Sequence, residues 1–202
     1  METKNPTATK LRILDVAADL ATTDGLEGLS FAQVAARLGL TKAGVARHFD
    51  GKAGLQAATI ERVSDQYLTA LQPALDAAPG LPRLQALMHA WLTLIEHIDF
   101  TGGCFFAATG SEFANRPGPL RESIASLTQA LITSLEEQAQ LALRLGELPT
   151  DTDAHELVFR LHALAGEANL RRQLLDDGSA FDSARAGVDA LLQSQSNEEH
   201  SP

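Results

Sequence analysis

The sequence predicts an all-α fold of about nine helices, and three features of the 202 residues lead to this prediction. Apolar residues recur three and four positions apart in one segment after another, which is the period of a helix with one buried face. No segment alternates apolar and polar residues as a half-buried strand does. Clusters of glycine and proline separate the periodic segments, so short turns are expected to join the helices.

Composition is typical of a globular protein with one or two domains. Hydrophobic residues make up 45% of the chain, and its length is sufficient to bury a core. The single cysteine, Cys104, excludes an intrachain disulfide. No apolar run reaches the roughly 18–20 residues of a membrane span, and the first ten residues lack the apolar centre of a signal peptide. We therefore expect a cytoplasmic protein that does not bind a membrane.

The turn signals give the order of the helices. Residues 1–8 are expected to be disordered, and an alanine-rich helix follows at about 9–23. A long helix is predicted at about 51–77, with Pro73 kinking it or ending its regular part. After the break at Pro79–Pro82, further helices are predicted at about 82–98, 104–113, 119–145, 152–175 and 180–194, followed by a disordered tail at 196–202.

Between the first helix and the long helix, the chain has the pattern of a helix-turn-helix. Ser30 and Gln33 form a capping box ahead of a short helix with an apolar face. Gly39 ends that helix, because glycine takes the left-handed backbone of a tight turn. Thr41 then caps a second helix of about two turns, which Val45 and Phe49 hold in the core.

The opposite face of this second helix is small and basic, and consists of Lys42, Ala43, Gly44, Ala46 and Arg47. A helix that enters the major groove of DNA needs such a face: little bulk near the bases and a few donors for base edges and phosphates. The charge distribution agrees, although the whole chain carries −10. Residues 1–56 hold seven basic and six acidic residues, whereas residues 57–202 hold nine and twenty.

Residues 11–55 resemble the N-terminal domain of the tetracycline-repressor (TetR) family of transcriptional regulators. The matching residues are Ile13, Leu14, Ala17, Ala18, Gly25, Ser30, Val34, Ala35, Leu38, Gly39, Leu40, Thr41, Lys42, His48, Phe49, Lys52 and Leu55. The segments 102–106, 112–113 and 116–119 are similar to a subset of these regulators and extend the resemblance to about residue 125. Ala46 departs from the family pattern, in which an aromatic residue there packs against the DNA backbone; Gly51 and Ala53 replace the usual Ser and Glu.

The resemblance implies a DNA-binding domain at 1–50 and an effector-binding and dimerisation domain at 51–195. It implies a ligand-responsive regulator, usually a repressor, that binds a double-stranded operator as a homodimer and leaves it when a small effector binds. The predicted DNA-binding residues are Ser30, Thr41, Lys42, Ala43, Gly44, Arg47, His48 and Lys52.

Large apolar and aromatic side chains in the middle helices predict a pocket for an apolar or aromatic effector. Its expected wall and polar orienting groups are Tyr67, Met88, Trp91, His97, Phe105, Phe106, Glu112, Phe113 and His162. The last two helices combine leucines with small residues, which suits close packing across a dimer. The expected interface residues are Leu157, Leu161, Leu164, Ala168, Val188 and Leu191.

Three other functions stay open. Cys104 stands at the start of a predicted helix, where a thiol pKa can be lowered, so a cysteine-dependent enzyme or a redox-sensing regulator is an alternative. Ala46 and the acidic total leave room for a helical dimer that has lost DNA binding. The histidines His89, His97, His155 and His162 lack a metal-ligand spacing, and we expect no metal and no cofactor.

Overall fold

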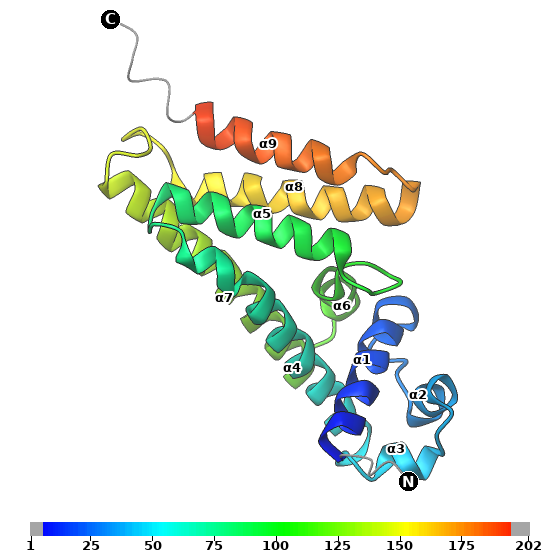
Figure 1. Ribbon diagram of the computed structural model, residues 1–202. Helices are drawn as coiled ribbons and strands as arrows, with labels where there is room; N and C mark the ends of the chain where they lie inside the picture. The colour runs from blue at the N-terminus through cyan, green and yellow to red at the C-terminus, as the bar shows by residue number, and fades with distance from the viewer. Residues whose placement is uncertain (1–5, 195–202) are drawn as a thin grey trace, which may run out of the picture. The chain divides into compact units, whose positions relative to one another are not determined.

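The computed structural model describes residues 6–194, and these residues form nine α-helices and one 3₁₀ helix without a β-strand (Figure 1). The predicted all-α fold is therefore confirmed. In chain order the elements are α1 (Pro6–Asp24), α2 (Phe31–Leu38), α3 (Lys42–Ala46), α4 (Gly51–Leu71), η1 (Gln72–Asp76), α5 (Leu81–His97), α6 (Phe105–Phe113), α7 (Pro119–Arg144), α8 (Ala154–Leu175) and α9 (Ala180–Ser194). None of these helices is long and apolar enough to cross a membrane.

Prolines explain two differences from the predicted boundaries. Helix α1 begins at Pro6, and not at residue 9, because proline fits the first turn of a helix, where its missing N–H has no partner to lose. Helix α4 ends at Leu71 and continues as the 3₁₀ helix η1, which contains Pro73; a proline inside an α-helix would lose a hydrogen bond and clash with the preceding turn. The predicted disorder of residues 1–8 is wrong for residues 6–8, which form the first turn of α1; residues 1–5 and the tail lie outside the described residues.

The described chain forms two compact units. The first unit contains the described residues up to Tyr67 together with Asp99–Leu127. In it α1 contacts α2 and α6, and α2 contacts α3. Its core includes Ile13, Leu26 and Val45, which are fully buried. Burial of a leucine-sized side chain contributes roughly 1.5–3 kcal/mol, so this small core is the main source of stability for the first three helices.

The second unit contains Leu68–Ile98 and the described residues from Thr128 onwards. Helices α5, α8 and α9 lie side by side in it and contact one another (Figure 1). Leu84, Met88, Leu161 and Val188 are fully buried between them. Helix α8 starts where Asp153 accepts the N–H groups of His155 and Glu156, which is a standard N-cap.

The compact units do not follow the predicted division at residue 50. The segment Asp99–Leu127, expected in the effector-binding domain, packs in the same unit as α1, α2 and α3. The functional division into 1–50 and 51–195 stays a prediction, whereas the packing division runs through α4 and α7.

Candidate nucleic-acid interface and effector-binding residues

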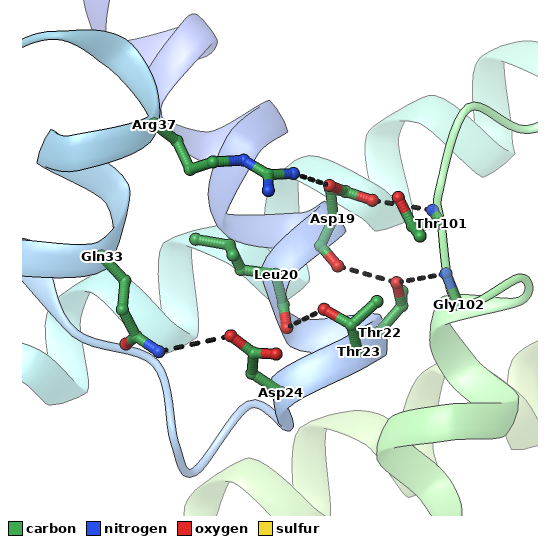
Figure 2. Close-up of polar contacts among 9 residues, drawn as sticks. All are labelled: Asp19, Leu20, Thr22, Thr23, Asp24, Gln33, Arg37, Thr101 and Gly102. Atoms are coloured by element: carbon green, nitrogen blue, oxygen red, sulfur yellow. Dashed lines mark hydrogen bonds and ion pairs between the residues drawn. The ribbon is translucent and has the colours of Figure 1, made fainter.

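Helix α2 begins at Phe31 because Ser30 caps it. The Ser30 backbone is extended (φ −139°, ψ 151°), and its Oγ accepts the N–H of Gln33 at 3.3 Å. The predicted N-cap is thus present. The Gln33 side chain makes bonds other than those of a capping box: its Oε1 accepts the Ser30 hydroxyl at 2.6 Å, and its Nε2 donates to Asp24 at 3.3 Å (Figure 2).

The turn to α3 has the predicted residues at its two ends. Gly39 is left-handed (φ 64°) and ends α2, and the N–H of Leu40 returns to the carbonyl of Ala35 at 2.9 Å. Thr41 caps α3 by accepting the N–H of Gly44 at 3.0 Å. Helix α3 spans five residues, which is shorter than the predicted two turns. The N–H groups of His48 and Phe49 bond three residues back, so a tighter turn follows the α-helical part.

The outer face of α3 is exposed. Thr41, Lys42, Ala43 and Arg47 are exposed, and Gly44 is half-buried. Val45 is fully buried on the opposite side and anchors the helix. Phe49 is half-buried and stacks on Phe31 with ring centroids 6.3 Å apart. The arrangement presents two cations and Ala43 to solvent, with Gly44 and Ala46 half-buried, and so has the small basic face that suits a groove.

Three basic side chains, from Arg47, His48 and Lys10, lie close together at the end of α3. The Nε of Arg47 donates to the Nε2 of His48 at 3.4 Å, and the Lys10 ammonium lies 5.6 Å from the centroid of the Phe49 ring. Burial, then the charges of Arg47 and Lys10, lower the pKa of His48. His48 is therefore neutral at neutral pH, and an anion placed beside it would favour its protonated form. Lys10, which was not among the predicted DNA-binding residues, belongs to this group, and only the folded chain brings it there.

Lys52 has a partner inside the chain. Its ammonium donates to the carbonyl of Glu27 and lies 3.8 Å from the Glu27 carboxylate. A cation in the first turn of a helix is disfavoured by the helix dipole, and as a predicted DNA-binding residue Lys52 would have a DNA phosphate as its compensating partner. The structure provides a different one, because Glu27 in the turn before α2 satisfies Lys52.

In the first unit, the predicted effector-binding residues include an aromatic cluster. The rings of Tyr67 and Phe106 meet edge to face at 5.1 Å, and Phe105 and Phe106 meet similarly at 5.5 Å. Tyr67, Phe105 and Phe113 are buried, and Phe106 is half-buried. The Tyr67 hydroxyl lies 3.4 Å from the Cys104 Sγ, and burial followed by Cys104 raises the pKa of Tyr67.

In the second unit, Trp91 of α5 and His162 of α8 come together. Their ring centroids are 5.0 Å apart, Trp91 is buried and His162 is half-buried. Burial lowers the pKa of His162, so the ring is neutral at neutral pH and offers both a donor and an acceptor. Met88 is fully buried one turn before Trp91.

Two predicted effector-binding residues are placed elsewhere. His97 at the end of α5 has a side chain that is 71% exposed and lies 3.6 Å from the Glu96 carboxylate, so it lines no buried wall. Glu112 uses both carboxylate oxygens on the backbone N–H groups of Leu26 and Glu27. The sequence could not reveal this partner, which lies 86 residues away from Glu112.

Four of the six predicted dimer-interface residues are buried inside the chain, which corrects the prediction for them. Leu157, Leu161 and Ala168 of α8 and Val188 of α9 are at most 4% exposed, because both helices bury these side chains inside the second unit. A second chain cannot reach these side chains. Leu164 and Leu191 are half-buried.

The outward side of α8 is also apolar. Five exposed apolar or small residues follow one another there at spacings of three and four, and they are Phe159, Ala163, Gly166, Leu170 and Leu174. The side chains of Phe159 and Leu174 are 69% and 70% exposed. We call these five residues the α8 stripe.

Cys104 is buried beside Tyr67 at the start of α6. A tyrosine with a raised pKa stays protonated at neutral pH, so this neighbour cannot act as the general base that a nucleophilic cysteine needs. In the part of the chain that the structure describes, no group of three or more His, Cys, Asp and Glu side chains could hold a metal ion.

A capped helix-turn-helix with a small, basic and exposed second helix defines the class of protein, which is a DNA-binding protein of the helix-turn-helix type. Sequence comparison makes the assignment more specific. Residues 13–59 match the model of bacterial regulatory proteins of the tetR family, and residues 80–188 match that of the tetracyclin repressor-like C-terminal domain. The chain belongs to the TetR family of DNA-binding transcriptional regulators.

Solved structures share the fold. A TetR transcriptional regulator from Chloroflexus aurantiacus is 22% identical, with a TM-score of 0.80 over 94% of this chain and 96% of that chain. A TetR-family regulator from Agrobacterium tumefaciens is 19% identical, with a TM-score of 0.80 over 95% and 100%. AibR, in complex with isovaleryl coenzyme A and operator DNA, is 24% identical, with a TM-score of 0.72 over 90% and 97%. No curated protein matches the chain.

Proposed function

We propose that this regulator is a repressor that binds a double-stranded operator as a homodimer and is released by a small effector with an apolar or aromatic part. The observation that supports it best is the outer face of α3, where Lys42 and Arg47 are exposed between small residues. Basic side chains on a short, slim helix suit the major groove and the phosphates beside it. Its site of action would be chromosomal DNA in the cytoplasm.

A homodimer is supported by the α8 stripe. Five exposed apolar or small residues on one helix face form an apolar surface of a kind that soluble chains usually cover. Two copies that cover this stripe would display two α3 helices, which can read half-sites about 34–36 Å apart, one turn of DNA. The operator is then expected to be a near-palindrome.

An effector with an apolar or aromatic part is supported by the aromatic residues that the fold buries beside polar groups. Trp91 contacts His162, and Tyr67 contacts Phe106. A ligand pocket needs such apolar walls with one or two orienting donors or acceptors. AibR is described in complex with isovaleryl coenzyme A, so a branched acyl thioester is one effector class worth testing on this chain. An effector releases the protein from DNA only by binding the released conformation more tightly.

The test is selection of an operator from a pool of random duplexes by the wild-type protein, followed by titration of the winning sequence. The expected result is a near-palindromic consensus whose half-sites are one helical turn apart, with an affinity that falls steeply as salt rises. A consensus without repeated half-sites would contradict the dimer. Absence of any enriched sequence would contradict the operator-binding function.

A further inference from the structure

The turn between α1 and α2 is a point where the DNA-binding helices are held by a distant part of the chain. Gly25 has a left-handed backbone (φ +83°), and Leu26 and Leu29 are buried below it. The N–H groups of Leu26 and Glu27 come directly after this change of direction, outside the hydrogen bonds of α1. Leu26 is buried and Glu27 is exposed, and a buried backbone donor costs free energy unless an acceptor is supplied.

Glu112 of α6 supplies both acceptors. Its Oε2 accepts the N–H of Leu26 at 2.8 Å, and its Oε1 accepts the N–H of Glu27 at 3.0 Å. A Cβ at Gly25 would lie 2.9 Å from the Glu112 Oε1, so the carboxylate occupies the space that a side chain would need. Hydrogen bonds to an ionised acceptor are about twice as strong as neutral ones. The carboxylate therefore holds the turn at two adjacent bonds.

The segment that leads into α6 holds the end of α1 at two more places. Asp19 accepts the N–H of Thr101 at 2.7 Å, and the Thr22 hydroxyl accepts the N–H of Gly102 at 3.0 Å (Figure 2). The approach is close, because a Cβ at Gly102 would lie 2.2 Å from the carbonyl oxygen of Thr22. The second oxygen of Asp19 accepts from Arg37 of α2 at 3.0 Å.

The opposite side of the turn is held by α4. The buried side chain of Gln56 donates to the carbonyl of Leu26 at 2.8 Å. The peptide groups around Leu26 are thus bonded by α6 on one side and by α4 on the other. Only six residues separate the end of α1 from the start of α2, so the placement of this turn sets where α2 begins and, through Gly39, where α3 is displayed.

We propose that Glu112 is a positioning residue for DNA binding, which acts from α6 by fixing the α1–α2 turn. DNA binding requires α3 to be held in one orientation while it contacts base edges and phosphates. Without the Glu112 carboxylate, the N–H groups of Leu26 and Glu27 lose their acceptors. Helices α2 and α3 then sample several orientations. The affinity for the operator falls in proportion to the fraction of molecules that stay in the binding-competent orientation.

The second unit offers a matched control. Glu147 accepts the N–H of Leu81 at 2.7 Å, next to Gly80, whose backbone is also left-handed (φ +100°). A Cβ at Gly80 would lie 2.3 Å from the Glu147 Oε2. This carboxylate caps a turn by the same chemistry as Glu112, and it starts α5, which carries none of the helix-turn-helix residues.

The experiment compares Glu112→Gln and Glu147→Gln with the wild type, on the operator that the wild-type protein selects. Affinity is measured by fluorescence anisotropy well below the melting temperature of every variant, and amide hydrogen exchange follows Leu26 and Glu27. Both substitutions are expected to lower the melting temperature. Only Glu112→Gln is expected to speed exchange at Leu26 and Glu27 and to weaken operator binding, by about tenfold.

A milder variant, Glu112→Asp, keeps the charge and shortens the reach, so it cannot hold both N–H groups. It is expected to fold and to bind more weakly than the wild type, which keeps the test valid if Glu112→Gln does not fold. Wild-type operator affinity in the folded Glu112 variants would overturn the proposal. An equal loss of affinity in Glu147→Gln would also overturn it, because the effect would then follow stability and not the position of α2.

Discussion

Arg47 and Lys42 are the exposed cations on the outer face of α3, and neither side chain supports the core. We predict that Arg47→Ala and Lys42→Ala weaken operator binding without lowering the melting temperature. A contact to a base edge is expected to contribute ~1–3 kcal/mol and to relax specificity at one position, whereas a phosphate contact lowers the salt slope by about one unit. Titration of the operator and of single-base variants at several salt concentrations distinguishes the two.

Arg144 is a suitable control for these variants. It is an exposed arginine of the second unit, at the end of α7. Arg144→Ala removes one positive charge without altering α3, so operator affinity is expected to change much less than in Arg47→Ala. Unchanged affinity in both α3 variants would show that this face does not contact DNA.

His162 is a half-buried base whose pKa is lowered by burial. Since its folded-state pKa lies below the unfolded value of about 6.5, the unfolded chain binds more protons in this range. The free energy of unfolding is therefore expected to rise as the pH rises from the lowered pKa towards 6.5, and His162 adds nothing further above that.

His162→Gln cannot titrate and is expected to show a smaller rise in stability over the same range. Denaturant unfolding at several pH values measures the difference. His48 has a pKa lowered in the same direction, so only the difference between the wild type and His162→Gln reports on His162. Identical pH profiles would mean that His162 is not desolvated in the folded protein.

Cys104 is buried beside the Tyr67 hydroxyl. We predict that the native protein reacts slowly with a soluble thiol reagent and at full speed once it is unfolded. Operator binding is expected to be insensitive to mild oxidant in both the wild type and Cys104→Ser. An operator complex that dissociates on oxidation only when Cys104 is present would make the protein a redox sensor.

At the scale of single helices, α8 shows why burial decides which apolar face meets a partner. It carries leucines on two sides, and the side of Leu157 and Leu161, which was predicted to meet a partner, packs inside the chain. The α8 stripe on the other side stays exposed. Periodicity marks both faces as apolar, but it cannot rank them, since the helix that covers each face lies elsewhere in the sequence.

We predict that Leu174→Glu, at an exposed position of the α8 stripe, converts the proposed homodimer to a monomer. A charge inside an apolar contact loses its hydration without gaining a partner, which costs several kcal/mol. Sedimentation velocity at several protein concentrations measures the outcome. Leu145→Glu is the matched control, because Leu145 is also an exposed leucine of the second unit and lies outside α8. A dimer in both variants would place the interface elsewhere.

Helix ends were predictable where a local residue determines them. Ser30, Gly39 and Thr41 act at the positions where the sequence placed caps, because capping involves only residues within one turn. The length of α3 was not predictable to the same precision. Its tighter final turn accompanies the burial of Val45 and the stacking of Phe49 on Phe31.

At the scale of the whole molecule, release from DNA requires that an effector favours one conformation of the folded chain. Trp91 is the single tryptophan and is buried against His162, so its emission reports on that part of the second unit. We predict that a compound that releases the protein from its operator also changes Trp91 emission, and that Trp91→Phe weakens the release. Isovaleryl coenzyme A and small aromatic compounds are the first to test.

The control is an acyl-free coenzyme A, which has the same nucleotide but lacks the apolar group. It is expected to leave both the operator complex and the emission unchanged. Releasing compounds that do not alter Trp91 emission, together with a normal response of Trp91→Phe, would mean that the effector binds away from Trp91.

The sequence by itself determined the all-α fold, the caps and turn of the helix-turn-helix, and the small basic face of α3, because these depend on residues within one or two helical turns of one another. The tertiary structure alone decided what depends on contacts between distant segments. In the folded chain Lys52 bonds to Glu27, and Glu112 bonds to a turn 86 residues away. It also buried one apolar face of α8 and exposed the other. Hydrogen bonds and burial act through space, so a residue's partner becomes known only when the chain is folded.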